Sequence, residues 1–333
     1  MRVAISGRII LVVAFLVVAF LGVACTSTMQ AHASSSSWPQ RTVRFIVPSG
    51  PGSAIDIDAR LFADRLTGRW GKSVVIDNRP GGDGLVAIGA FTSANDDHTL
   101  LFASADTFAV HPYEHEKLLY DARTDLLPIA SVSAVVLAVS VPEALQVGSL
   151  SGLAALARQR PGQLNAAAVQ GLSDFLLSGF LAASGVQMPR IPYRDILQAP
   201  NDLAEGRIQV LMTSLDVVLP LMPTGRIKVL AVNSRSRAPA APHVPTAVES
   251  GYHAVTLEGL NGLFGPRGMA DDLRERIAAD VIAVAADPII PARLGLIGQI
   301  VKLGGPAEFA ARIEEQRVIL ATVTKSLGLR HAP

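Results

Sequence analysis

Residues 43–60, VRFIVPSGPGSAIDIDAR, carry the pattern that decides the fold. Val43–Val47 is a run of mainly β-branched and aromatic residues, as in a strand buried on both faces. Pro48 ends that run, and two glycines permit a turn whose backbone N–H groups a ligand can approach. A helix follows, with an apolar stripe expected at Ile57, Leu61, Phe62 and Leu66.

The order strand, glycine-rich turn, helix is typical of an open α/β sheet. In such sheets small ligands lie beyond the carboxyl ends of the strands, and a helix N-terminus there favours an anion. An ordinary turn with a Ser or Asp helix cap is the alternative explanation.

Length and composition allow a sizeable core. The chain has 333 residues, half of them apolar, which favours two folded domains over disorder. Residues 1–33 read as an export signal, with basic Arg2 and Arg8, an apolar stretch and a small-x-small cleavage site ending at Ala33. We therefore expect a periplasmic protein. Lipid anchoring at Cys25 is the alternative to cleavage.

The charge balance excludes one class of partner. Without residues 1–33 the chain loses two of its 29 basic residues and none of its 28 acidic ones, so 27 minus 28 gives a net charge of −1. Nucleic-acid binding needs a basic footprint, and no local run provides one. Cys25 is the only cysteine, so a mature domain without it has no internal disulfide.

Further along, strand and helix patterns alternate, which predicts largely parallel sheets. Strands are expected at 73–77, 99–103, twice within 126–141, and at 163–168, 188–193, 208–212, 229–232 and 257–265. Helices are expected at 85–94, 150–158, 175–184, 199–205, 271–286, 289–297 and 307–327.

Six segments in order resemble the tripartite tricarboxylate transporter receptors called the Bug family. They are Trp38–Arg60, Asn78–Gly82, Ile191–Arg194, Asp202–Leu203 with Gly206, His243–Thr246 and Asn261–Phe264. The resemblance spans nearly the whole mature chain. It implies a solute-binding protein of the Venus-flytrap type (periplasmic-binding-protein type II), with a mixed, mostly parallel sheet in each of two α/β lobes.

The resemblance also implies the organisation and the function. Residues 38–138 and 259–333 would form lobe 1, and residues 139–258 lobe 2, with crossings at 135–141 and 257–265. A monomer would capture a small carboxylate or amino-carboxylate between the lobes and deliver it to a membrane transporter complex or a sensor. No catalysis, cofactor or metal is implied.

The family's ligand contacts, carried over by position, fall on turns that follow strands. They predict ligand contacts at Gly52, Ser53, Ala54, Asp56, Ser104, Ala105, Asp106, Thr107, Gly171, Leu172, Ser173, Tyr193, Asp195 and Thr213. Backbone N–H groups and small hydroxyls can hold a carboxylate without Lys or Arg. Helix capping is the alternative role for the hydroxyls of Ser104, Thr107 and Ser173.

Some positions depart from the family pattern. Ser53 and Ile55 stand where the family usually has Gly and Thr, which makes the pocket wall bulkier, and Phe175 replaces a common His. Asp106 adds an acid beside the proposed clamp. One hypothesis is that an ammonium or aromatic nitrogen of the ligand faces Asp56, Asp106 or Asp195. The alternative is that Asp106 and Asp195 are solvated loop acids.

Other chemistry has weaker support. Gly71-Lys72-Ser73 lies between a helix and a strand, the reverse of a phosphate loop, and the glycines near Gly84 do not match a dinucleotide fingerprint. His111 and His115 with Glu114 and Glu116 suggest metal ligands, but Pro112 predicts a surface turn there instead of a helix. A secreted α/β hydrolase is the remaining alternative, although the chain has no Gly-x-Ser-x-Gly elbow.

Overall fold

The structure, a computed structural model, describes residues 38–115, 117–169, 171–193 and 198–326. The predicted export signal with Cys25, and also Glu116 and Asp195, lie outside the described residues. Within the described ranges, no helix combines the length and apolar character needed to cross a bilayer. The two sheets belong to one compact unit that begins at Arg41.

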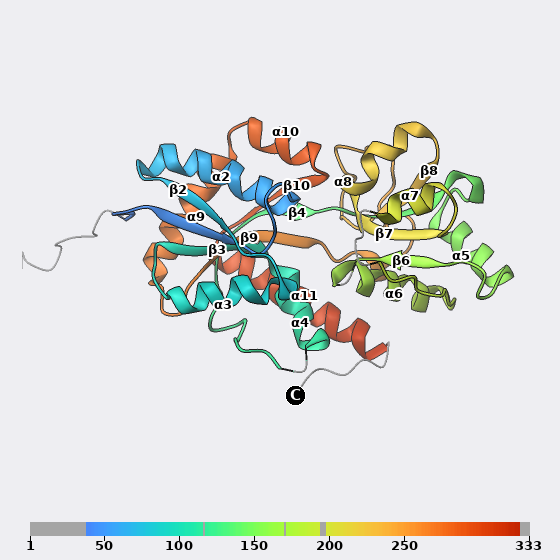
Figure 1. Ribbon diagram of the computed structural model, residues 1–333, viewed down its shortest axis with the longest axis horizontal. Helices are drawn as coiled ribbons and strands as arrows, with labels where there is room; N and C mark the ends of the chain where they lie inside the picture. The colour runs from blue at the N-terminus through green and yellow to red at the C-terminus, as the bar shows by residue number, and fades with distance from the viewer. Residues whose placement is uncertain (1–37, 116, 170, 194–197, 327–333) are drawn as a thin grey trace, which may run out of the picture. The chain divides into compact units, whose positions relative to one another are not determined.

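A six-stranded sheet with the order β10-β4-β9-β3-β1-β2 forms the first part of this unit (Figure 1). Four of its strands run in one direction, and β9 and β10 run in the other. Its strands are β1 (Val43–Val47), β2 (Val74–Asn78), β3 (Thr99–Ser104), β4 (Leu127–Val135), β9 (Gly259–Gly265) and β10 (Gln299–Gly304). We call this sheet with its helices lobe 1.

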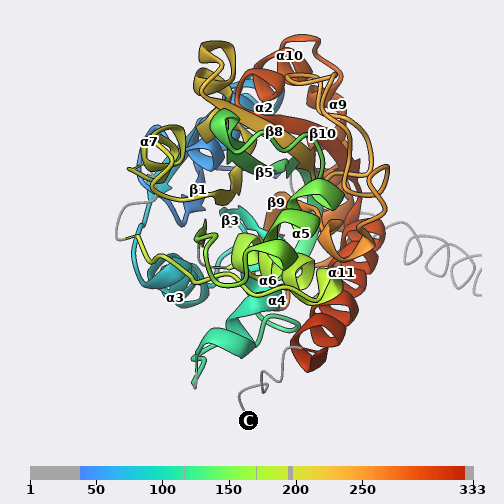
Figure 2. The same cartoon turned by 90° about the vertical axis from the view of Figure 1, so that its right-hand side faces the viewer.

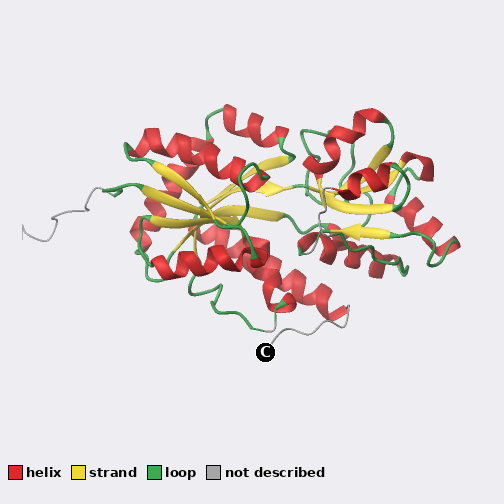
Figure 3. Cartoon of the chain, in the orientation of Figure 1, coloured by secondary structure: helices red, strands yellow, loops and turns green. Residues whose placement is uncertain are grey.

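Helices cover both faces of the lobe 1 sheet (Figures 1 and 3). Phe62 of α2 packs near Phe102 on one face, and Phe309 of α11 packs against Phe264 on the other. The helices of this part are α2 (Ala54–Trp70), α3 (Leu85–Ala94), α4 (Ala105–Glu114), α9 (Asp271–Ala285), α10 (Ile289–Leu296) and α11 (Pro306–Ser326), with the short η1 (Gly82–Gly84) before α3.

A four-stranded sheet with the order β6-β7-β5-β8 forms lobe 2, together with the helices packed on it. Here β6, β7 and β8 share one direction, and β5 runs against them. The strands are β5 (Leu137–Pro142), β6 (Ala166–Ala168), β7 (Val210–Ser214) and β8 (Ile227–Val232). The helices are α5 (Leu150–Gln159), α6 (Leu172–Ser184), α7 (Ala199–Ala204) and α8 (Leu215–Val218), with the short turns η2 (Glu143–Leu145), η4 (Leu219–Thr224) and η5 (His253–Val255).

The chain passes between the two sheets twice. It leaves lobe 1 at the end of β4, and Val136 alone separates β4 from β5 of lobe 2. It returns between β8 and β9. Because β4 pairs with β9 in the register Val135 to Gly259, the two crossings lie side by side. Figure 2 shows α4, α6 and α11 next to one another on one side of these crossings.

The predicted α/β fold with two mixed sheets is confirmed, and so are most element positions. The strand expected at 188–193 is wrong, because only Arg190 forms an isolated bridge there and Pro189 and Pro192 have no N–H to donate to a ladder. The turn expected at Pro112 is also wrong, because α4 continues to Glu114 with Pro112 inside it. Strand β10 was not predicted.

The buried face of α2 also differs from the predicted stripe. Ile57 is 37% exposed, whereas Asp58 is fully buried. Asp58 Oδ2 lies 2.6 Å from Ser133 Oγ on β4, and that hydroxyl lies 2.7 Å from Gln299 Oε1 on β10. Asn261 on β9 donates its amide N–H groups to this network. A polar cluster therefore joins α2 to three strands inside lobe 1.

The hydrogen count of this cluster favours a protonated Asp58. Ser133 carries one hydroxyl hydrogen and cannot donate it to both neighbouring oxygens. A neutral Asp58 donates to Ser133, which leaves the Ser133 hydrogen for Gln299. Burial raises the pKa of Asp58 from its ordinary value of 3.8 to about 7, while the bonds from Ser133 and Asn261 act in the opposite direction. At a pH between these two values, Asp58 of the folded protein thus retains a proton that the unfolded chain has already released.

This proton predicts a pH dependence of stability. Between about pH 4 and pH 7 the folded state binds more protons than the unfolded state, so the free energy of unfolding falls as pH rises. In urea unfolding, the parent should lose ~2–3 kcal/mol between pH 5 and pH 8 relative to Asp58→Asn, which does not titrate. Asp64→Asn, an exposed position on the same helix, should follow the parent. Parallel curves for the parent and Asp58→Asn would contradict a protonated Asp58.

Candidate functional site

The turn after β1 begins the candidate site. Pro48 follows the last strand residue, and Gly52 has a φ of 82°, a left-handed conformation that favours glycine. Ser53 caps α2, since its Oγ accepts a hydrogen bond from Asp56 N at 3.3 Å. Gly52 is exposed, and Ser53 and Ala54 are partly exposed, so this turn is accessible from solvent.

Asp56 holds this turn in place. Its carboxylate is 1% exposed and accepts bonds from Gly52 N at 2.8 Å, Arg60 Nε at 2.9 Å and Asn78 Nδ2 at 2.9 Å. Burial acts to raise the pKa of Asp56, but the bonds from Arg60, Gly52 and Asn78 outweigh it and keep the pKa below its usual range. Both oxygens are already bonded inside the protein. The structure therefore gives Asp56 a positioning role for the turn.

Two other segments meet this turn at the carboxyl ends of the parallel strands. Asn78, the last residue of β2, also donates to Ser49 O at 2.9 Å. A Cβ placed on Gly84 would lie 3.4 Å from Pro48 Cβ and 3.9 Å from Thr107 Cγ2. The turns after β1, β2 and β3 therefore converge.

The turn after β3 leads into α4. Ser104 donates its hydroxyl hydrogen to the Asp106 carboxylate, and it makes no side-chain cap bond to the helix. Thr107 lies inside the first turn of α4, so it does not cap the helix either. Ala105 is fully buried, which leaves only its backbone to face a ligand.

Asp106 lies where the two lobes meet. Burial raises its pKa, against the opposing effect of bonds from Ser104 and from its own backbone N–H. A Cβ on Gly259 would be 3.3 Å from Asp106 Oδ1, 3.5 Å from Leu172 Cδ2 and 3.5 Å from Val135 Cβ. The first turn of α4 in lobe 1 and the first turn of α6 in lobe 2 therefore approach each other across the crossing strands.

The facing side of the site belongs to α6. This helix starts at Leu172, three residues before its predicted start, so Ser173 lies in its first turn and is not its cap. Leu172 and Ser173 are 7% and 6% exposed. Gly171 stands at the N-cap with a φ of 93° and no side-chain cap bond. The capping alternative therefore fails for Ser104, Thr107 and Ser173.

The remaining ligand contacts predicted from the sequence are Tyr193, Thr213 and Asp195. Tyr193 is partly buried against the lobe 2 core and donates its hydroxyl hydrogen to Asp202 Oδ2 at 2.7 Å, so it is tied to α7. Burial and that bond raise the pKa of Tyr193 to about 12. Thr213 is 1% exposed, and its Oγ1 has no partner among the described residues. Thr213 follows Met212, which pairs with Ala168, three residues before Gly171. Asp195 lies outside the described residues.

Sequence reasoning placed His111 on a surface turn, and this is wrong. His111 is 1% exposed within α4, where its Nε2 lies 2.9 Å from Asp83 O and its Nδ1 lies 2.7 Å from Tyr120 OH. Burial lowers the pKa of His111. Glu114, which the sequence suggested only as a metal ligand, is a further residue near the site. Burial raises its pKa, and a bond from the Gly171 backbone opposes that effect.

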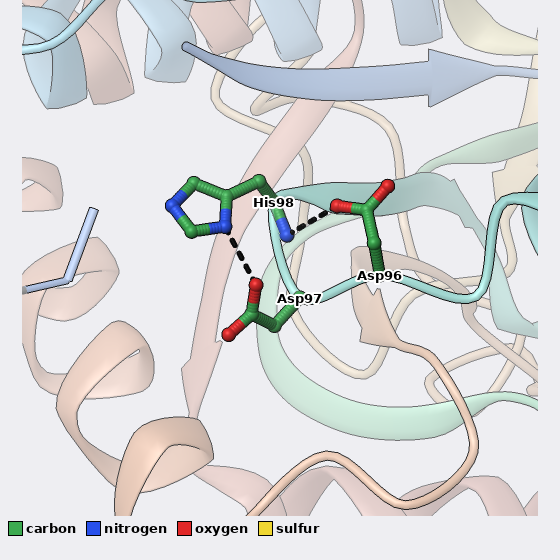
Figure 4. A group of neighbouring side chains, drawn as sticks. All are labelled: Asp96, Asp97 and His98. Carbon is green, nitrogen blue, oxygen red and sulfur yellow. Dashed lines mark hydrogen bonds and ion pairs between the residues drawn. The ribbon is translucent and has the colours of Figure 1, made fainter. Parts of the chain in front are cut away.

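A group of side chains of the types that bind metal ions lies at the other end of β3. Asp96, Asp97 and His98 bring one ligand atom each within 4.8 Å of one another (Figure 4). Asp96 already accepts bonds from Arg41, His98 N and Thr99. Its carboxylate therefore stabilises the turn before β3, at the edge opposite the converging turns.

Comparison with known proteins decides the family. The protein-family model described as "Tripartite tricarboxylate transporter family receptor" matches residues 58–294. The chain belongs to this receptor family. Proteins of this family are solute-binding receptors and not enzymes. A UPF0065 protein of Bordetella bronchiseptica is 30% identical over 299 residues, or 90% of this chain and 89% of that protein.

Other relatives agree with the assignment. Protein BugT of Bordetella pertussis is 30% identical over 73% of this chain and 76% of its own length. The solved structure of R. palustris Rpa4515 with adipate has a TM-score of 0.76 and 29% identity, over 88% of this chain and 99% of that one. These likenesses confirm the two-lobed periplasmic-binding-protein fold of the receptor.

The role of Asp56 gives a prediction for the receptor. Asp56→Ala removes the acceptor of Gly52 N and one of the two acceptors of the Asn78 amide, so the free energy of unfolding should fall by ~1–3 kcal/mol. Amide hydrogen exchange should also accelerate at Gly52. Asp64→Ala, at an exposed acid of the same helix, should change stability by less than ~0.5 kcal/mol. Equal losses for the two variants would show that Asp56 does not hold the turn.

Proposed function

We propose that this receptor captures a small carboxylate-bearing ligand between its lobes and delivers it to a tripartite tricarboxylate-type transporter or a sensor. The observation that carries the proposal is the convergence of small-residue turns at the carboxyl ends of β1, β2 and β3, opposite the first turn of α6. A monomer in the periplasm is the form in which we expect it to work.

Two helix N-termini support a carboxylate as the bound group. Neither α4 nor α6 has a side-chain cap bond, and their first turns meet near Gly259. The first N–H groups of a helix have no partner within it, and the helix dipole favours negative charge at that end. A carboxylate between Thr107 and Ser173 would accept bonds from both lobes at once. It would therefore stabilise a closed arrangement of the lobes over an open one.

The protonation state of Asp106 determines which second functional group the site favours in its ligand. Burial raises the pKa of Asp106, and in its neutral form this acid can donate a hydrogen bond to a ligand carboxylate. An ionised Asp106 would instead attract an ammonium group. We propose the neutral form and a dicarboxylate ligand, in line with adipate in the R. palustris relative.

The proposed lobes are residues 38–138 with 259–333 and residues 139–258. Val136, where the chain passes from the lobe 1 sheet to the lobe 2 sheet, lies just before the first of these boundaries. Closure would be a rotation of one lobe against the other about the paired crossings, with the closed form recognised by the membrane partner. No observation favours the α/β hydrolase alternative.

A thermal-shift panel tests the binding proposal. At about 100 times its dissociation constant a ligand should add ~2.7 kcal/mol of stability, and so a few degrees to Tm. We expect a shift with adipate or a shorter dicarboxylate such as malate, a smaller one with 6-aminohexanoate, and none with 1,6-hexanediol. A larger shift with 6-aminohexanoate would indicate an ionised Asp106. No shift with any carboxylate, or equal shifts with the diol, would contradict carboxylate capture.

A matched pair of variants tests the site. Thr107→Val keeps the shape of a half-buried side chain in the α4 turn but removes its hydroxyl, and we expect about tenfold weaker binding of the dicarboxylate that gives the largest shift. Thr92→Val removes a hydroxyl that bonds to Ile88 O on α3 and should leave affinity unchanged. Calorimetric titration measures both. If Thr107→Val binds like the parent, the turn after β3 is not part of the site.

A further inference from the structure

The first crossing is hydrogen-bonded to both lobes at a single residue. Val136 N donates to Gly298 O at 3.3 Å, at the start of β10 in lobe 1. Val136 O accepts from Leu215 N at 2.8 Å, at the start of α8 in lobe 2. Val136 is therefore tied to lobe 1 and to lobe 2 at the same time.

The side chain of Asn233 joins the first crossing to the second. It is 1% exposed and lies just after β8. Its Oδ1 accepts from Leu137 N at 2.7 Å, and its Nδ2 donates to Leu257 O at 2.7 Å. The backbone N–H of Asn233 also donates to Leu137 O at 3.0 Å. One amide thus spans the two chain crossings and uses both its donor and its acceptor.

Gly298 determines how closely the lobes approach beside this amide. Its φ is 63°, and a Cβ there would lie 2.7 Å from Asp216 N and 3.3 Å from Leu215 Cβ. The contact atoms belong largely to the backbone of α8, which cannot swing aside as a flexible side chain does. Any side chain at 298 would therefore push the start of α8 away from β10.

The second crossing has its own link to lobe 1. Glu258, 9% exposed, accepts from Arg235 N at 3.0 Å and pairs with Lys302 Nζ of β10 at 2.9 Å. A cavity of about 220 Å³ lies beside this pair. The Asn233 amide connects the two crossings in addition to the pairing of β4 with β9.

We propose that Asn233 and Gly298 are positioning residues that form the pivot of the motion between the lobes. Asn233 fixes the spacing of the two crossings so that they turn together, and Gly298 sets the closest approach of α8 to β10. The inference rests on the proposed function in that closure captures the ligand. The pivot itself can be tested without any ligand.

Distances between spin labels test the pivot directly. Labels at Val86→Cys on α3 and Asn201→Cys on α7, both exposed positions, report the separation of the lobes in a full-length Cys25→Ser background. Without ligand, Asn233→Ala should broaden the distance distribution, because two buried crossing groups lose their common partner. Gly298→Ala should shift its mean, because the added methyl separates α8 from β10.

Ser133→Ala is the matched control, since it removes a buried polar group from the lobe 1 core and leaves both crossings intact. It should leave the distribution as in the parent, even if it lowers Tm as much as Asn233→Ala does. If Asn233→Ala does not fold, the mean distance between the labels in Gly298→Ala tests the pivot on its own. Unchanged distributions in the folded pivot variants, or equal broadening in Ser133→Ala, would overturn the inference. Because no ligand is present, these outcomes are independent of whether dicarboxylates bind.

Discussion

The pairing of β4 with β9 is the constraint on which the other features depend. It places the two chain crossings next to each other, so a short stretch of paired backbone connects two separate cores. Gly259 lies in this stretch and leaves room for Asp106 from lobe 1 and Leu172 from lobe 2. A larger residue there would separate the first turns of α4 and α6. The geometry of the site is therefore set at the crossings as much as in the turns themselves.

Buried polar groups have different structural roles in different parts of this receptor. Asp56 and its partners order an exposed turn, and the Asp58 cluster fixes α2 on the sheet beneath it. The Asn233 amide connects the backbone of the first crossing to the backbone of the second. The Asp58 cluster and the Asn233 amide are held by partners far away in sequence, whereas Asp56 is held by Gly52, Arg60 and Asn78. In each case an unsatisfied partner in the interior makes the loss of the group costly.

The sequence predicted what local patterns determine. The run Val43–Val47, the proline after it and the glycines beyond were sufficient to place the first strand, turn and helix. The burial of α2 was not predictable in this way, because Asp58 is buried through Ser133, Asn261 and Gln299, all on distant strands. The positions of Ser104 and Thr107 came from family resemblance, and only the structure shows that neither residue caps its helix.

The order of strands has a consequence for how the chain acquires its structure during synthesis. Strand β9 stands between β3 and β4, so the six-stranded sheet is split until residue 265 is available, more than 120 residues after β4 has been made. The last helix, α11, then contributes Phe309 to the lobe 1 core and Leu320 to the core shared with α6. Contacts of such long sequence separation form late. A nascent chain of this protein therefore stays incomplete in both lobes until nearly its whole length is present.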